Sequence, residues 1–425
     1  MTAMLLVGVF LICSLLGMPI AFCFGVSAAI TCIVGGIPLL IIVQRLMTSI
    51  DSFSLIAVPG FVLAGEIMTR GGVSKRIVNF SNSLVRQFRG GLSMAAVFSG
   101  IIMGGISGSA TADTAALGTP LIPQMEKENY PRDFSAAVIA ASGSLGIIVP
   151  PSIPMIIYSI SSSISLVDLF LAGYVPGITM GFIAMYSCYI LSKKKGYGQS
   201  SVRFSWRYLL VSSKESLWAI ITPLIVIGGI LSGIFTPTES SIIAAVYSLI
   251  ISIYINKELR WREMPRVLLE STKTAARVVF IFASASVFSY IFINEGVPDL
   301  FIKFMFSISA SKIVVLFMLN VILIFTGCII DILAATVIFV PVLIPLGEAL
   351  HMDQLQLAMI FIVNMTMGLL TPPVGYCIFT SSSIAGISIE KTALAAMPFL
   401  VSFGTVLFII NIFPQFVLFV PNLFH

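Results

Sequence analysis

The chain carries very little charge for its length. Only 10% of its 425 residues are Asp, Glu, Lys or Arg, whereas a soluble globular domain carries about 25%. Most of its surface therefore faces a medium other than water, which excludes an ordinary soluble domain. The six cysteines lie inside apolar stretches without CxxC spacing, so we expect neither a disulfide framework nor a metal site from them. The basic residues are not interleaved with aromatic ones, so we expect no nucleic-acid partner.

Long apolar segments are abundant in the sequence, and 58% of the residues are hydrophobic. A membrane-spanning helix needs about 20 mainly apolar residues, and the chain holds roughly ten or more such segments, several of them short. The clearest runs are residues 220–235, 241–255, 278–293, 313–325 and 394–413. Residues 4–24 lack a basic start and a clean cleavage site, which indicates a first span rather than a signal peptide. We predict an all-α integral membrane protein.

Basic residues gather in three stretches between the apolar runs, at 70–89, 193–214 and 257–277. Loops rich in Lys and Arg stay in the cytoplasm, so we place all three stretches there. The segment between Arg89 and Glu126 then begins and ends on the cytoplasmic side, and it is too long for one straight span. A re-entrant hairpin fits this segment, with the Gly- and Ser-rich residues 104–111 at its tip. Non-helical backbone at that depth survives only where protein buries it or where it lines a watery cavity.

The second half of the chain repeats these features at a constant offset in residue number, called the repeat offset below. This one offset relates Leu121-Ile122-Pro123 to Leu343-Ile344-Pro345, Gly105 to Gly327, Gly146 to Gly368, Pro150-Pro151 to Pro372-Pro373, Ser142 to Asn364 and Ser144 to Thr366. The second hairpin, about residues 311–350, has mainly acidic flanks, whereas the first has a basic base. We therefore expect two repeats of opposite orientation, as in many secondary transporters.

Two proline pairs predict a break in the helix that follows each hairpin. Proline lacks an N–H group and disfavours helical backbone at the residue before it, so Pro150-Pro151 and Pro372-Pro373 each divide a helix into two halves. Carbonyl groups freed at such a break can bind a cation, and the N-terminal ends of half-helices attract anions. The alternative is a pair of kinks that serve packing alone.

These features divide the chain into five parts, with the hairpins and broken helices around one site at the membrane midplane. We expect N-terminal scaffold helices at 1–89, a first transport repeat at 90–164 (hairpin 90–126, broken helix 134–164), central scaffold helices at 165–310, a second transport repeat at 311–386 (hairpin 311–350, broken helix 355–386) and a C-terminal membrane helix at 387–425.

Five motifs resemble the large membrane subunit of the tripartite ATP-independent periplasmic (TRAP) transporters. They are Asp51-Ser52-Phe53-Ser54-Leu55, Leu63-Ala64-Gly65-Glu66-Ile67-Met68, Ser107-Gly108-Ser109-Ala110-Thr111-Ala112-Asp113, Pro150-Pro151-Ser152 and Thr371-Pro372-Pro373-Val374-Gly375. The resemblance covers nearly the whole chain. It implies an inverted-repeat, elevator-type fold like that of the ion-transporter superfamily, in which a mobile domain carries both re-entrant hairpins past a scaffold. It also implies sodium-coupled uptake of organic acids by a multi-pass protein of the bacterial inner membrane. The expected partners are a periplasmic substrate-binding protein, a separate small four-helix membrane subunit and membrane lipid.

Backbone carbonyls and hydroxyls can supply oxygen ligands for sodium without titratable charge, and the resemblance supports one such site in each repeat. At the first tip and break the candidate ligands are Ser107, Gly108, Ser109, Ser142, Gly143, Val149 and Pro150. At the second tip and break they are Thr326, Gly327, Asn364, Gly368 and Thr371. The alternative is that these small residues only permit close helix packing.

An anionic substrate would lie between the two tips, with Ser107, Ser109, Ser152 and Asp331 as its predicted contacts. A carboxylate inside a membrane is costly, which makes Asp331 a functional candidate, although an N-cap for the following helix is compatible with it. Asp113 is a weaker candidate. Sialic acid, other sugar acids and C4-dicarboxylates all fit such a site.

Two alternatives to the tripartite transporter are an intramembrane serine protease and a stand-alone ion-coupled carrier. Gly105-Ile106-Ser107-Gly108 looks like the GxSG of intramembrane serine proteases, but neither His351 nor His425 is expected to reach Ser107 as a base. We therefore predict no enzyme and no organic cofactor. A stand-alone sodium/dicarboxylate symporter or a sodium/proton antiporter shares many of these features, although the scarcity of intramembrane ionisable residues favours sodium over protons.

Overall fold

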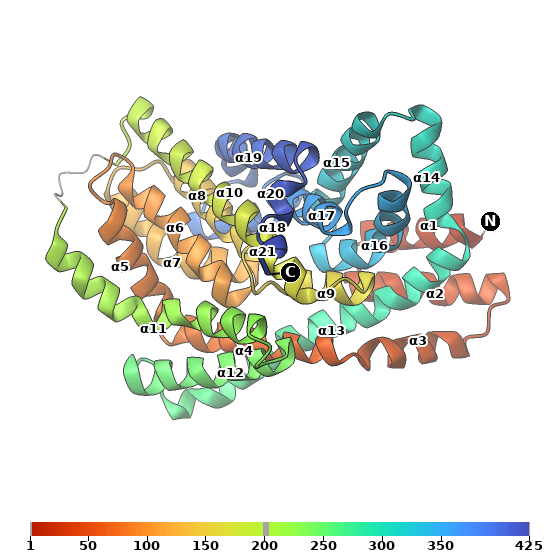
Figure 1. The fold of residues 1–425 in the computed structure, drawn as a ribbon, viewed down its shortest axis with the longest axis horizontal. Helices are drawn as coiled ribbons and strands as arrows, with labels where there is room; N and C mark the ends of the chain where they lie inside the picture. Colours follow the sequence, from red (N-terminus) through yellow and green to blue (C-terminus); the bar gives the residue numbers. More distant parts are fainter. Residues whose placement is uncertain (1, 199–203, 425) are drawn as a thin grey trace.

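The computed structural model describes residues 2–198 and 204–424, and all regular secondary structure within them is helical (Figure 1). The first half contains α1 (Thr2–Leu15), α2 (Ile20–Gly35), α3 (Leu40–Ile50), α4 (Ala57–Arg70), α5 (Val73–Val85), α6 (Gly91–Ser107), α7 (Ala110–Lys127), α8 (Arg132–Ser144), α9 (Ile153–Ser162) and α10 (Leu166–Lys195). The second half contains α11 (Trp206–Leu231), α12 (Pro237–Ile250), α13 (Met264–Asn294), α14 (Val297–Ile308), α15 (Lys312–Ile329), α16 (Ile332–Ala349), α17 (Gln354–Gly368), α18 (Tyr376–Ala385), α19 (Ile389–Ile412), α20 (Gln415–Leu418) and α21 (Pro421–Phe424). A π-helical turn, η3 (Ile251–Ile255), extends α12.

Eight helices of the described chain are long and apolar enough to cross a membrane: α4, α10, α11, α12, α13, α15, α16 and α19, some with their flanking turns. The predicted all-α class is confirmed. Six further apolar helices (α1, α2, α3, α6, α9 and α17) have only 10–17 residues. Full-length spans are therefore fewer than the apolar segments of the sequence suggest, because several of those segments form short helices.

Each repeat contains a helix pair followed by an interrupted helix. The pair α6 and α7 is joined by residues 108–109, and the pair α15 and α16 by residues 330–331. The interrupted helices consist of α8 and α9, separated by residues 145–152, and of α17 and α18, separated by residues 369–375. Each interruption contains one proline pair, and the peptide bond within each pair is cis.

The repeat offset extends from the sequence motifs to the helix ends. It relates both ends of α7 (Ala110–Lys127) to the corresponding ends of α16 (Ile332–Ala349). It also relates the start of α8 at Arg132 to the start of α17 at Gln354. The repeat therefore describes local structure as well as sequence.

Side-chain caps explain where several of these helices begin. Asp331 accepts a hydrogen bond from the Leu333 N–H at the start of α16, and Asp353 caps α17 in the same way. Thr236 and Glu239 form a reciprocal capping box at the start of α12. Each such cap stabilises a helix by about 1 kcal/mol.

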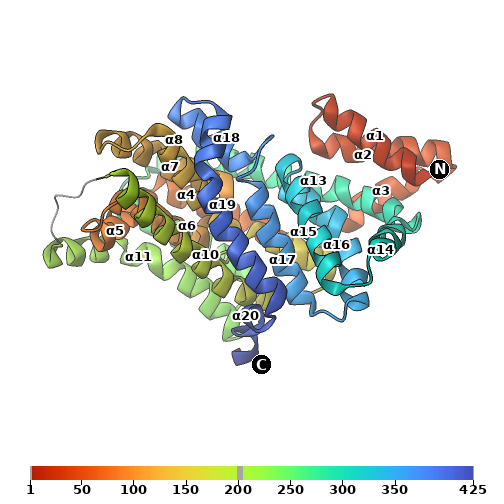
Figure 2. The same cartoon turned by 90° about the horizontal axis from the view of Figure 1, so that it is seen from above.

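The second halves of the interrupted helices pack across to the opposite repeat. Helix α9 packs against α16, and α18 packs against α7 and α8, as Figure 2 shows for α18. Outside this centre α4 packs on α12, while the long α13 packs on α2, α3, α4 and α16 (Figure 1). The crossed packing brings both tips and both breaks to one region of the molecule.

Candidate functional site

The first tip lies directly against the first break. Gly108 has a φ of +63°, and a Cβ atom there would lie 2.7 Å from the carbonyl oxygen of Pro151, so the approach requires glycine. The Ile153 N–H donates to the Gly108 carbonyl over 3.4 Å. Helix α6 touches the same break, since a Cβ on Gly104 would lie 2.9 Å from the Cα of Gly146.

The second tip meets the second break in the same manner. A Cβ on Gly368 would lie 2.5 Å from the Cα of Gly327. The Val374 N–H donates to the Cys328 carbonyl over 3.2 Å. Each half of the molecule thus has a close backbone contact between tip and break, with a backbone hydrogen bond across it.

Asp113, one turn into α7, is fully buried beside the first break. The Ser107 hydroxyl donates to its Oδ1 over 2.6 Å. Its Oδ2 covers Gly146, where a Cβ would lie 2.2 Å away, and this oxygen has no hydrogen-bond partner among the described residues. A buried carboxylate so weakly satisfied requires compensation by a proton or a cation. The repeat offset relates Asp113 to Ala335, so the second repeat has no equivalent carboxylate.

A cavity of about 90 Å³ lies between the two tips. Its lining residues come from both tips, both breaks and α13: Gly108, Ser109, Ala110, Thr111, Ile147, Ile153, Pro154, Thr274, Val278, Asp331, Ile332, Leu333, Leu369 and Tyr376. Pockets for small organic ligands measure about 300–1,000 Å³. In this conformation the cavity has room for a few water molecules at most, and a whole organic acid requires it to open further.

The first turns of four helices face this cavity. They are the starts of α7 (Ala110, Thr111), α9 (Ile153, Pro154), α16 (Ile332, Leu333) and α18 (Tyr376). N–H groups in the first turn of a helix lack intrahelical partners and carry partial positive charge. The lining residues include no Lys or Arg, and Asp331 is the one acid among them. At α9 the Ile153 N–H already donates to Gly108 and Pro154 has no N–H, and at α16 the Leu333 N–H donates to Asp331. The cavity therefore offers the starts of α7 and α18 to an anionic group and one carboxylate to a hydrogen-bond donor.

Two of the four predicted substrate contacts line the cavity, namely Ser109 and Asp331. The other two hydroxyls are engaged elsewhere. Ser107 donates to Asp113, and Ser152, which is fully buried, donates to the Ile147 carbonyl over 2.7 Å.

Comparison with known proteins decides the family. Residues 7–416 match the family model described as "Tripartite ATP-independent periplasmic transporter, DctM component". The chain belongs to this family. It is thus a TRAP large permease, a multi-pass membrane protein of a bacterial transporter family, and the resemblance carried by the five sequence motifs is confirmed.

Relatives agree with this assignment, and one solved structure has a similar fold. The permease is 36% identical to the C4-dicarboxylate TRAP transporter large permease protein DctM of Pseudomonas aeruginosa. The 378 aligned residues cover 89% of this chain and 88% of that one. It is 34% identical over 409 residues to the sialic acid TRAP transporter large permease protein SiaM of Vibrio cholerae, with 96% of each chain covered. The YdaH transporter of Alcanivorax borkumensis has a similar fold, with a TM-score of 0.65, 13% identity and 87% of each chain covered.

The protease interpretation has no support from the permease or its relatives, which are named as transporter permeases. His351 lies in the turn after α16, at the opposite end of that helix from the tip. A helix of 18 residues is about 27 Å long, so this imidazole is far from Ser107. His425 lies outside the described residues.

The predicted sodium ligands of the permease form two groups, one at each tip–break contact. The hydroxyls of Ser142, Thr326 and Thr371 each donate to the carbonyl four residues earlier, over 2.7, 2.8 and 2.8 Å. A hydroxyl that donates keeps its acceptor lone pairs. These oxygens therefore remain able to bind a cation.

A chain of three asparagines links α17, α15 and α19. The Asn364 Nδ2 donates to the Asn320 Oδ1 and to the Ile360 carbonyl, both over 2.7 Å. The Asn320 Nδ2 donates to the Asn411 Oδ1 over 3.1 Å, and the Asn411 Nδ2 donates to the Leu407 carbonyl over 2.7 Å. Because a backbone carbonyl can only accept, the two ends of the chain fix the orientation of every amide. One amide oxygen of the three asparagines takes no part in these hydrogen bonds. It is the Oδ1 of Asn364, which is buried and has no partner among the described residues.

Sequence reasoning missed several residues of this region. Thr274 and Val278 on α13 line the cavity, but in the sequence Thr274 belongs to a basic stretch that indicates only topology, and Val278 begins an apolar run. Tyr376 also lines the cavity, and its position directly after the second proline motif was an available signal. Asn320 and Asn411 gave no signal, because each lies alone in an apolar run.

Proposed function

We propose that this permease carries an organic acid, of the sialic acid, sugar acid or C4-dicarboxylate class, into the cell together with sodium. The observation that carries the proposal is the cavity between the tips, where four helix N-termini meet without any basic side chain. Helix N-termini bind carboxylates. The named substrates of the relatives, C4-dicarboxylate and sialic acid, are carboxylates as well.

Ser109 and Asp331 are the proposed substrate contacts that already face the cavity. The substrate carboxylate would lie at the start of α7, and a substrate hydroxyl would donate to Asp331 at the start of α16. Ser107 and Ser152 remain candidates for an opened conformation, in which their present hydrogen bonds would be exchanged.

Sodium would occupy the two tip–break contacts. At the first contact the oxygens come from Ser107, Gly108, Ser109, Ser142, Gly143, Val149 and Pro150, and at the second from Thr326, Gly327, Asn364, Gly368 and Thr371. The buried, weakly satisfied carboxylate of Asp113 and the unpartnered Oδ1 of Asn364 support cations there. Cations would also offset the charge of an anionic substrate, which the lining residues do not neutralise.

The movement would be of the elevator type, with the helix pairs as re-entrant hairpins of two inverted repeats. Support comes from the shared helix boundaries, the crossed packing of α9 and α18, and the opposite charge at the bases of the two pairs. The inner membrane is the proposed location, and a periplasmic binding protein and a small four-helix subunit are the proposed partners.

The deciding experiment is uptake into proteoliposomes against a panel of organic acids. It is run with and without the periplasmic binding protein, and with sodium or potassium outside. We expect uptake of one acid class that requires both the binding protein and sodium. Uptake unchanged in potassium would refute the coupling, and uptake without any periplasmic protein would favour a stand-alone symporter.

A further inference from the structure

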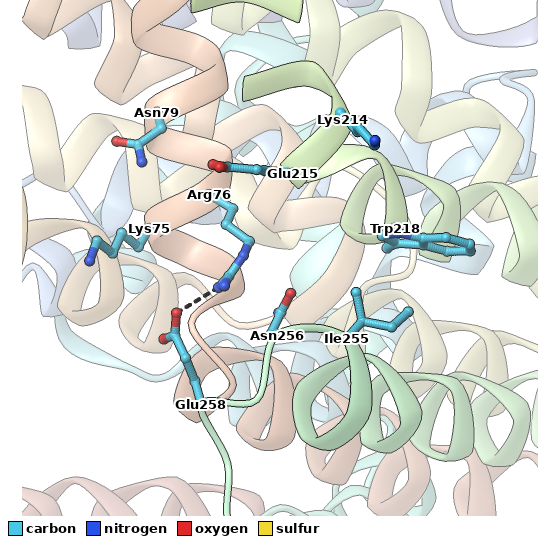
Figure 3. A pocket seen from close by; sticks show the side chains of 9 residues that line it. All are labelled: Lys75, Arg76, Asn79, Lys214, Glu215, Trp218, Ile255, Asn256 and Glu258. Carbon is cyan, nitrogen blue, oxygen red and sulfur yellow. Dashed lines mark hydrogen bonds and ion pairs between the residues drawn. The ribbon is translucent and has the colours of Figure 1, made fainter. Parts of the chain in front are cut away.

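A second pocket lies outside the tips and the breaks, where α5, α11 and the η3 end of α12 meet (Figure 3). It has a volume of about 490 Å³, which falls within the range of about 300–1,000 Å³ typical of ligand sites. None of its lining residues belongs to the tips or the breaks. It is therefore a feature of the outer helices and is separate from the cavity described above.

Two lysines of this pocket form no ion pair within the described chain, and the charges of the pocket do not balance. Arg76 forms an ion pair with Glu258 over 2.8 Å, and Glu215 extends toward the Arg76 side of the pocket in Figure 3. Lys75 and Lys214, from α5 and α11, lie on either side of Arg76 in that view and form no ion pair with any described residue. Three basic side chains face two acidic ones, so the pocket has one net positive charge.

The residues around the pocket are typical of the interface between a membrane and the cytoplasm. Its residues belong to, or directly adjoin, all three basic stretches of the sequence, which the positive-inside rule assigns to the cytoplasm. Trp218 forms one wall and is partly exposed, as is common for tryptophan at the membrane interface. Beyond it α11 and α12 present exposed apolar side chains, among them Leu224 and Ile250.

We propose that this pocket binds the headgroup of an anionic glycerophospholipid from the cytoplasmic leaflet. The phosphate lies at the mouth of the pocket, where the long side chains of Lys75 and Lys214 can turn toward it, and the acyl chains follow the apolar faces of α11 and α12. A lipid with one net negative charge neutralises the pocket, whereas a zwitterionic lipid leaves its charge uncompensated. Phosphatidylglycerol is therefore preferred over phosphatidylethanolamine.

The test is native mass spectrometry of the purified full-length permease with added phosphatidylglycerol or phosphatidylethanolamine, which counts bound lipid on folded protein only. A lysine near an anionic headgroup contributes about 1 kcal/mol, so Lys75→Gln or Lys214→Gln should weaken phosphatidylglycerol binding about fivefold and the double variant about 25-fold. Lys194→Gln is the matched control, because it removes the same charge from the exposed end of α10, outside the pocket.

The expected result is a preference for phosphatidylglycerol that the double variant loses and the Lys194→Gln variant keeps. Glycerol phosphate, which lacks acyl chains, should compete only weakly. Equal binding of both lipids, or equal loss in the control, would overturn the proposal. It would likewise be overturned if the double variant kept its lipid but lost a co-purifying membrane subunit, because the pocket would then be a protein contact.

Discussion

The asparagine chain predicts that a residue outside the proposed sodium site controls sodium affinity. Replacing Asn320 by Leu removes two hydrogen bonds, the one from Asn364 at 2.7 Å and the one to Asn411 at 3.1 Å. The Asn411 Oδ1 then lacks a donor, which costs less than the penalty of about 1–3 kcal/mol for a fully buried acceptor because Asn411 is only half-buried. Asn364 keeps its bond to the Ile360 carbonyl, which still sets the orientation of the amide, but it loses one of the two bonds that hold its Oδ1 in position.

A ligand oxygen that must be repositioned at a cost of about 1.4 kcal/mol weakens binding about tenfold. We therefore expect the sodium concentration for half-maximal uptake in Asn320→Leu proteoliposomes to rise about tenfold, with a lower thermal unfolding midpoint. Asn411→Leu should act in the same direction, and the double variant should fall short of additivity because both residues belong to one network.

Ser402→Ala supplies the matched control. Ser402 is on α19, like Asn411, and its hydroxyl lies 2.7 Å from that of Ser187 on α10. Its loss should lower stability without changing the sodium dependence. If Asn320→Leu behaves in the same way as this control, the chain serves packing alone and the reasoning is refuted.

Three further substitutions test the tips and the breaks. Gly368→Ala places a Cβ 2.5 Å from the backbone of Gly327, so we expect loss of uptake and a lower unfolding midpoint. Gly404→Ala is the control, because its Cβ would meet only the flexible side chain of Met367 at 3.6 Å and should be tolerated in both assays. Asp331→Asn keeps an N-cap but loses the carboxylate, so the unfolding midpoint should hold while substrate affinity in uptake falls; unchanged uptake would remove the residue from the substrate site. Asp113→Asn keeps an oxygen for Ser107 but removes the buried charge of the first contact, so sodium should raise the unfolding midpoint less than it does in the unaltered protein, where both contacts bind it. An equal sodium effect in both proteins would exclude the carboxylate from the cation site.

The sequence was sufficient to predict where the two helices of the centre are interrupted, because a duplicated pattern carries its own check. Proline pairs end α8 and α17 for local reasons, and glycines at the tips mark a close approach that larger side chains forbid. The sequence did not predict contacts between segments that are distant along the chain. Thr274 lines the cavity because α13 packs on α16. The residues around Thr274 in the sequence do not indicate that α13 packs there. Sequence spacing favours Asp331 over Asp113 because it does not show which face of α7 meets the break.

The two repeats share a backbone plan and differ in the polar atoms placed on it. Ser109 and Asp331 are related by the repeat offset, each at the N-cap of the returning helix, and both face the cavity. Ser142 is matched by Asn364, and Asp113 by Ala335. The glycine contacts and helix starts, which build the site, are therefore duplicated, whereas the groups that would meet ions and substrate are not. Because a small organic acid is itself asymmetric, with a carboxylate at one end and hydroxyls elsewhere, a cavity with a hydroxyl on one tip and a carboxylate on the other can fix its orientation in a way that two identical tips could not.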